Sequence, residues 1–327
     1  MARKILWHDG YASNPKTVFT DNQWTKYTDS IINYAKANSY DVVSLTALAA
    51  SEDGYSSLQP AELGFLPAPA GTAYKYINQF IEAAEAEGLS VGLNVYQKTA
   101  FKGYPSRTDT IPQLSNEIAK NITHTKPLII GIDGEVNKLK ENGTSASGFT
   151  PNEYATQWMN SLDGAGVNYD TFAILGGNKQ EKIWSNEPKF GNVYEYYSTD
   201  GWAGDFNHNI GDIFKNNPKG ALNYITSQMK SGAVQNISVT RGNIDPVTGY
   251  STGMIPAFSI GTGDGSNTLG KHANGKAIGP AVFGTWESEQ FNTFIDLFEA
   301  AYPEVGDIFV YQADQLPLAW IPSPQSI

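Results

Sequence analysis

The stretch "PLIIGIDGE" (residues 127–135) is an apolar run that ends in two carboxylates, Asp133 and Glu135, with one glycine between them. A short apolar run bounded by turn residues is typical of a strand buried on both faces, as in a parallel sheet. Seven similar runs occur along the chain, and segments with helical spacing of apolar residues separate most of them. The eight runs cover residues 3–8, 40–48, 89–96, 127–135, 168–177, 192–198, 254–261 and 307–314.

Capping residues and apolar stripes predict the helices between these runs. Asp21 is expected to cap the first helix, and Gly88 is expected to end the second. Thr150 and Glu153 form a capping box, with Pro151 at the first helical position. Further helices are predicted around residues 114–122, from Pro218 and after Ser288. Eight strands that alternate with helices predict an α/β protein with a single (β/α)8 barrel domain over residues 1–327.

Two parts of the chain depart from a regular barrel. Residues 233–253 are predicted to form a hairpin inserted before the seventh strand. After the eighth strand only residues 315–327 remain, and their prolines predict that a regular eighth helix is missing. One apolar row of the eighth strand, such as Ile308 and Val310, should then face outward. We expect the tail, with Trp320 near its centre, to fold over this row or to form a contact between subunits.

Composition excludes several classes of protein. Hydrophobic residues make up 40% of the 327 residues and charged residues only 17%, which is typical of a globular chain. A net charge of -11 argues against nucleic acid as the main partner, because basic residues supply that affinity. The chain has no cysteine, which excludes disulfides and thiol nucleophiles. No spacing of His, Asp and Glu indicates a metal site, and no cofactor motif is present.

The sequence also bears on location. The first residues contain no apolar stretch of signal-peptide length, and no run approaches the roughly 20 apolar residues of a membrane helix. We therefore expect a protein that does not bind membranes, and that is either cytoplasmic or exported by a non-classical route.

The acid pair is the main candidate site. Residues two apart in a strand point to the same face, so Asp133 and Glu135 should project together at the carboxyl end of the fourth strand. That end is where barrels of this type carry out their chemistry. Two acids this close cannot both ionise cheaply, so one pKa should rise and give the general acid that glycosidic bond cleavage needs. A structural alternative is a loop-closing pair with Lys138 or Lys140.

The D-x-E motif at the end of the fourth strand resembles the chitinase-type family 18 of glycoside hydrolases, with its motif DxxDxDxE, and the family 25 lysozymes. The resemblance implies that Glu135 is the proton donor and that Asp133 orients an N-acetyl group that attacks the anomeric carbon. It also implies that Tyr194, Tyr196 or Tyr197 holds the acetamido group and that Trp320 forms the floor of the sugar site. Barrel packing is the alternative role for these tyrosines.

The sequence departs from the family 18 pattern at several positions. Gly131 and Leu128 stand where the motif has its earlier aspartates, and the third strand lacks the SxGG of that family. Other strand ends offer further candidates for binding sugar or for a second carboxylate. Asn94, Tyr96, Gln312 and Asp314 are candidate substrate-binding residues, and Glu195, Asp314 and Asp9 are candidate second carboxylates.

Two functions follow from these residues. The first is a hydrolase that cleaves glycosidic bonds in a GlcNAc-containing polysaccharide, chitin-like or peptidoglycan-like. The alternative is a non-catalytic protein that binds glycan or assembles with its own copies in a surface layer, filament or virus particle. The departures from the motif, the absence of cysteine and the missing eighth helix favour the alternative. The first function implies a polysaccharide or glycan partner, and the alternative implies a glycan partner or a homo-oligomer.

Overall fold

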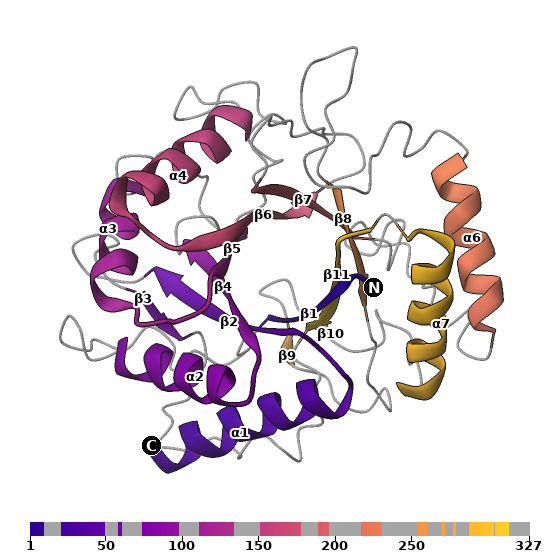
Figure 1. Ribbon diagram of the computed structural model, residues 1–327, viewed down its shortest axis with the longest axis horizontal. Helices are drawn as coiled ribbons and strands as arrows, with labels where there is room; N and C mark the ends of the chain where they lie inside the picture. The colour runs from indigo at the N-terminus through magenta and orange to yellow at the C-terminus, as the bar shows by residue number, and fades with distance from the viewer. Residues whose placement is uncertain are drawn as a thin grey trace.

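The parallel strands of the computed structural model close into a ring (Figure 1). The structure describes residues 1–9, 21–49, 58–60, 74–97, 111–133, 151–177, 189–195, 217–230, 254–259, 270–271, 277–278, 288–303 and 305–313. Within these ranges eight strands pair in parallel, and the ring closes because β1 pairs with β11 on one side and with β2 on the other. In ring order they are β1 (Arg3–Asp9), β2 (Val42–Ala49), β4 (Ser90–Gln97), β5 (Leu128–Asp133), β6 (Tyr169–Gly177), β7 (Phe190–Glu195), β8 (Met254–Ser259) and β11 (Asp307–Ala313).

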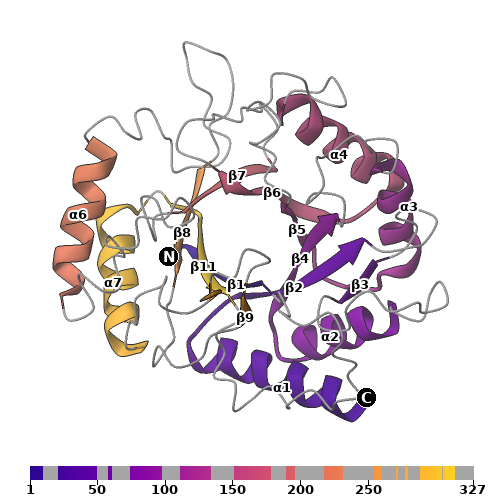
Figure 2. The same cartoon turned by 180° about the vertical axis from the view of Figure 1, so that it is seen from behind.

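Helices surround this ring on its outer side, and Figure 2 shows the same arrangement from behind. The fold is therefore a (β/α)8-type barrel, which confirms the predicted fold class. None of the helices in the described ranges is long and apolar enough to cross a membrane. The helices are α1 (Asp21–Ala37), α2 (Tyr74–Ala86), α3 (Ile111–Asn121), α4 (Pro151–Ala165), α6 (Pro218–Lys230) and α7 (Ser288–Ala301).

The capping residues mark most of the helix boundaries that the sequence predicts. Helix α1 begins at Asp21, and α4 begins at Pro151, the residue expected at the first helical position. Gly88 follows α2 with a φ of 85°, a backbone conformation that only glycine adopts without strain. Gly166 ends α4 in the same way, with a φ of 76°. The sequence therefore specifies these boundaries through local backbone preferences.

Two short strand pairs were not predicted from the sequence. β3 (Leu58–Pro60) pairs antiparallel with the end of β2, and β9 (Gly270–Lys271) pairs with β10 (Ala277–Ile278) after the seventh barrel strand. Strands of two or three residues are too short for periodicity to reveal them. The hairpin predicted at residues 233–253 and the tail at 315–327 lie outside the described residues.

The core has two layers. One lies between the strands and the helices, and the other fills the interior of the barrel with side chains from alternate positions of the same strands. In β5, Leu128, Ile130 and Ile132 belong to the outer layer, whereas Ile129 belongs to the interior. The interior cluster consists of Ile5, Trp7, Val42, Ile129, Ala173 and Phe309.

Trp7 occupies the interior at the place where Gly92 of β4 leaves room for it. Its ring centroid lies 4.9 Å from that of Phe309. A Cβ atom added to Gly92 would lie 2.9 Å from Cζ3 of Trp7 and 3.3 Å from Cβ of Ser44. Gly92 is therefore required by the width of the indole ring and not by its own backbone conformation.

We expect Gly92→Ala to lower the free energy of unfolding by about 1–3 kcal/mol, because the methyl group would overpack the barrel interior. Urea unfolding followed by tryptophan fluorescence measures this change. Gly164→Ala is the matched control, since a Cβ at this position in α4 meets nothing within 4 Å. It should leave stability equal or higher, because alanine is the better helix former. Equal stability of the Gly92→Ala variant and the wild type would contradict the close contact.

The outward row of β11 is already covered within the chain. Ile308 and Val310 are fully buried and belong to the outer core layer, together with Phe298 of α7 and Val305. This row therefore needs no second subunit to shield it from water. Trp320 lies outside the described residues, so its role as a lid, a subunit contact or a sugar floor stays a prediction.

Glu85 near the end of α2 fixes the turn that leads into β5. Its carboxylate accepts hydrogen bonds from the backbone N–H of Thr125 at 2.9 Å, from the Thr125 hydroxyl at 2.6 Å and from the backbone N–H of Lys126 at 2.9 Å. Burial raises the pKa of Glu85, but these hydrogen bonds and the charge of His124 outweigh it, so the pKa lies below its usual value. The ionised carboxylate is thus the form that the fold prefers.

This preference makes the contribution of Glu85 depend on pH. A carboxyl group with a lowered pKa in the folded state stabilises the protein fully above its unfolded pKa, near 4.5, and loses that contribution as the pH falls through the lower folded value. We expect Glu85→Gln to lower the melting temperature near pH 7 and to make less difference at pH 3. Thermal unfolding across this range measures the change. If the melting temperatures of the wild type and of Glu85→Gln differ by the same amount at every pH, the lowered pKa assigned to Glu85 is contradicted.

Candidate active site

The carboxyl ends of the parallel strands bring several predicted site residues to one end of the barrel. β5 ends at Asp133, which pairs in register with Tyr96 of β4. β7 ends at Glu195, and Tyr194 precedes it opposite Pro256 of β8. On the far side of the ring, Gln312 of β11 pairs with His8 of β1, and Asp9 follows. The backbone therefore places these residues, distant in sequence, around the same rim.

Asp133 continues the alternation of the interior row. Ile129 packs inside the barrel, and Gly131 follows it two positions further along β5. Because residues two apart share a face of a strand, position 133 belongs to the same row. That the acid pair points into the mouth of the barrel stays a prediction, because the structure describes only the backbone of Asp133 and Glu135 lies outside the described residues.

The other predicted residues are described less completely. For Asp133, Tyr96, Tyr194 and Gln312 the structure describes the backbone but not the side chain. Glu135, Tyr196, Asp314 and Trp320 lie outside the described residues, as do Lys138 and Lys140. Their roles stay predictions. Among the described residues no group of three or more His, Asp or Glu side chains could hold a metal ion.

Asn94 is the predicted site residue whose side chain the structure describes. It lies on β4 two residues before Tyr96 and is fully buried. Neither its amide nitrogen nor its amide oxygen has a hydrogen-bond partner among the described residues. The indole N–H of Trp7, also fully buried, has none either in the same part of the chain. Two unpaired polar groups in a barrel interior are unusual, because buried polar groups are nearly always paired.

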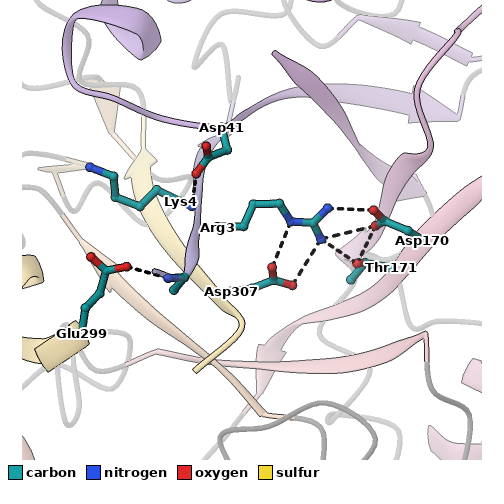
Figure 3. A network of polar contacts seen from close by, with 8 residues as sticks. Arg3, Lys4, Asp41, Asp170, Thr171, Glu299 and Asp307 are labelled. Atoms are coloured by element: carbon teal, nitrogen blue, oxygen red, sulfur yellow. Dashed lines mark hydrogen bonds and ion pairs between the residues drawn. The ribbon is translucent and has the colours of Figure 1, made fainter. Parts of the chain in front are cut away.

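A second polar cluster lies at the opposite, amino end of the barrel, and sequence reasoning missed it. Arg3, the first residue of β1, reaches both the neighbouring strand β11 and β6 on the far side of the ring (Figure 3). Its Nε donates to Asp307 Oδ1 at 2.9 Å, and its Nη1 donates to Asp170 Oδ2 at 2.7 Å. Its Nη2 donates to the Thr171 hydroxyl at 3.1 Å, and this hydroxyl donates to Asp170 Oδ1 at 2.8 Å.

A register shift between β5 and β6 makes this cluster possible. Leu128 pairs with Tyr169, but Ile129 pairs with Thr171, so Asp170 is an extra residue in β6. Both Asp170 and Thr171 therefore reach Arg3. Burial alone would lower the pKa of Arg3, but the hydrogen bonds and charges of Asp170 and Asp307 raise it further than burial lowers it. The cluster joins β1, β6 and β11 and lies away from the carboxyl end, where barrels of this type carry out their chemistry, so we expect it to stabilise the barrel.

Comparison with known proteins supports the fold. No protein-family model matches this sequence, and no curated protein matches it. Among solved structures, a "GH5-4 broad specificity endoglucanase" from Clostridium acetobutylicum is similar with a TM-score of 0.50 and 14% identity, over 95% of this chain and 87% of that chain. A second one, from an uncultured bovine rumen ciliate, has a TM-score of 0.50 and 12% identity, over 94% of this chain and 86% of that chain.

Both structures are glycoside hydrolase barrels, so the predicted likeness to that class of barrel holds at the level of the fold. They belong to family 5 and not to families 18 or 25, to which the D-x-E motif pointed. At identities this low the likeness establishes the barrel and leaves the chemistry to the residues of this chain.

Proposed function

We propose that this chain is a glycoside hydrolase in which Glu135 is the general acid and Asp133 is its partner. The observation that carries the proposal is the position of Asp133, at the carboxyl end of β5 and in the interior row of a closed barrel. Glu135 follows two residues later in the sequence. The similar barrels are endoglucanases, which is consistent with a polysaccharide as substrate.

The proximity of the two carboxyl groups supplies the chemistry. When Asp133 is ionised, its charge raises the pKa of Glu135, because two negative charges so close repel each other. Glu135 then stays protonated near neutral pH and donates its proton to the glycosidic oxygen as the bond to the anomeric carbon breaks. In the second half of the reaction the Glu135 carboxylate accepts a proton from the water that attacks the anomeric carbon.

The nucleophile of the first step depends on the sugar. In a GlcNAc-containing polysaccharide the acetamido oxygen of the substrate can attack the anomeric carbon, with Asp133 orienting its N–H and Tyr194 or Tyr196 holding the group. A glucan has a hydroxyl group at that position, so a second protein carboxylate would be needed. Glu195, at the end of β7, is the candidate on this rim. We favour the GlcNAc-containing polymer because the D-x-E spacing suits the first route.

A panel of glycans tests the proposal. The purified chain is incubated with chitin oligosaccharides, peptidoglycan, cello-oligosaccharides and manno-oligosaccharides, and the products are separated by chromatography. We expect cleavage of the chitin or peptidoglycan substrates. Cleavage of the glucans alone would replace the acetamido route with one that uses Glu195. Binding without cleavage of any substrate would support the non-catalytic alternative and overturn the proposal.

A further inference from the structure

One seam of the ring, between β1 and β2, is joined only near its amino end. β2 pairs with β4 along its whole length, so β1 and β3 share the other edge of β2. β1 takes the amino-terminal part of this edge, at Val42 and Val43, and β3 takes the carboxyl-terminal part, from Ala47 to Ala49. In the described residues no pairing joins β1 to β2 beyond Val43. At the mouth of the barrel it is therefore β3, not β1, that lies along β2 (Figure 1).

Tyr74, the first residue of α2, holds β3 in this position. Its hydroxyl accepts a hydrogen bond from the backbone N–H of Leu58 at 3.1 Å. Leu58 is fully buried, and it is the residue of β3 that pairs with Ala49 of β2. A buried backbone N–H needs an acceptor, because leaving it unpaired costs about as much as a lost hydrogen bond. The Tyr74 hydroxyl supplies that acceptor and so ties β3 to α2.

A second contact gives the Tyr74 hydroxyl its direction. The hydroxyl donates to Glu117 Oε2 of α3 at 3.4 Å, and Asn121 Nδ2 donates to the same oxygen at 2.6 Å. Burial raises the pKa of Tyr74 more than the hydrogen bond from Leu58 lowers it, so the hydroxyl keeps its proton. The bond from Leu58 is the shorter of the two that Tyr74 makes, and it is the one that fixes β3.

We propose that Tyr74 is a positioning residue for glycan binding, because it holds β3 against β2 at the mouth of the barrel. This proposal rests on the glycan substrate of the proposed function and adds the part of the rim that sets its affinity. β3 lies in the connection from β2 to α2, and connections at the carboxyl ends of the strands build the binding sites of such barrels. Tyr74 is only 4% exposed, so it acts on the glycan through β3 and not by contact.

The place of β3 in the ring predicts an effect on binding and not on bond cleavage. Asp133 ends β5, and the strand β4 separates β5 from β2. A displacement of β3 would therefore alter the wall of the mouth without moving the strand that carries Asp133. We expect the loss of the Tyr74 hydroxyl to change KM and to leave kcat nearly unchanged.

Tyr74→Phe tests the proposal, because it keeps the ring and removes only the acceptor of the Leu58 N–H. We expect hydrogen–deuterium exchange of the Leu58 amide to become about 10–100-fold faster. KM for the best substrate of the glycan panel should rise about 3–10-fold, with kcat within about twofold. Tyr169→Phe is the matched control: its hydroxyl is also buried and donates to the Met159 carbonyl at 3.5 Å, but at the amino end of β6. It should change neither KM nor the exchange of Leu58.

The exchange measurement needs no glycan, so it separates this proposal from the proposed function. The amide of Ile130, in the middle of β5, reports opening of the whole barrel. Unchanged exchange at Leu58, or an equal increase at Leu58 and Ile130, would overturn the role of Tyr74. An unchanged KM with faster exchange at Leu58 would overturn it as well.

A wild type that binds glycan without cleaving it would overturn the proposed function alone. Weaker binding by Tyr74→Phe in a calorimetric titration would then still support the positioning role. A wild type that neither binds nor cleaves any glycan of the panel would overturn both proposals.

Discussion

Glu135→Gln is expected to reduce glycan hydrolysis by about 10²–10⁴-fold, while binding of the same glycan stays within about twofold of the wild type. Glutamine has nearly the size and shape of the protonated acid, but it cannot transfer a proton to the leaving oxygen. The loss should therefore appear in kcat and not in the dissociation constant. Initial rates with the best substrate of the panel, and calorimetric titration of a non-hydrolysed analogue, measure the two quantities.

Glu87→Gln is the matched control for this experiment. Glu87 lies just after α2, and its carboxylate pairs with Lys36 on the surface, outside the mouth of the barrel. Its replacement removes one negative charge without touching the proposed site. Equal rates for the wild type and Glu135→Gln would end the assignment of Glu135 as the general acid. Equal losses in both variants would assign the effect to net charge.

Arg3→Met is expected to lower the free energy of unfolding by about 3–5 kcal/mol, the largest effect on stability that we predict. The reason is the difference in burial between the two acids that Arg3 holds. The side chain of Asp307 is only 1% exposed, so the loss of Arg3 would take a positive charge away from a carboxylate that water hardly reaches. Asp170 is 39% exposed and can be hydrated instead. Chemical unfolding at neutral pH measures the loss.

Two control variants test why Arg3→Met loses stability. Lys75→Met removes the surface ion pair with Asp21 and should change stability little, because exposed ion pairs contribute little. The double variant Arg3→Met with Asp307→Leu should recover much of the loss, because an apolar pair leaves no buried charge behind. A loss no larger than that of Lys75→Met would show that Asp307 is already hydrated. Failure of the double variant to recover would point to lost packing.

The sequence predicted the barrel because local signals repeat along the chain. Strand-like runs recur eight times along the chain, and residues such as Asp21, Pro151 and Gly88 set helix boundaries through their own backbone preferences. Ring closure itself has no local signal, since the pairing of β1 with β11 joins residues more than 300 positions apart. Ring closure was inferred only from the number of predicted strands. This evidence is weaker than the local sequence signal that marks each helix cap.

The site was predictable only in part, for a related reason. Alternation within one strand placed Asp133 on the interior row, and the structure adds that Asn94 of the neighbouring strand is buried just below. The Arg3 cluster could not be predicted, because it depends on a register shift between β5 and β6. Nothing in the sequence near Asp170 marks it as an extra residue in its strand. Contacts that depend on the register between distant strands cannot be predicted from the sequence of any single strand.

The pairing of β1 with β11 also has a consequence for how the protein forms during synthesis. β1 leaves the ribosome before the other strands of the barrel, but its second neighbour is made only when residue 313 has been translated. Until then β1 has an unsatisfied edge, and such edges pair readily with other chains. The growing chain must therefore keep an open sheet from aggregating until β11 has been made. Chains truncated before β11 should depend on molecular chaperones more than chains that include β11.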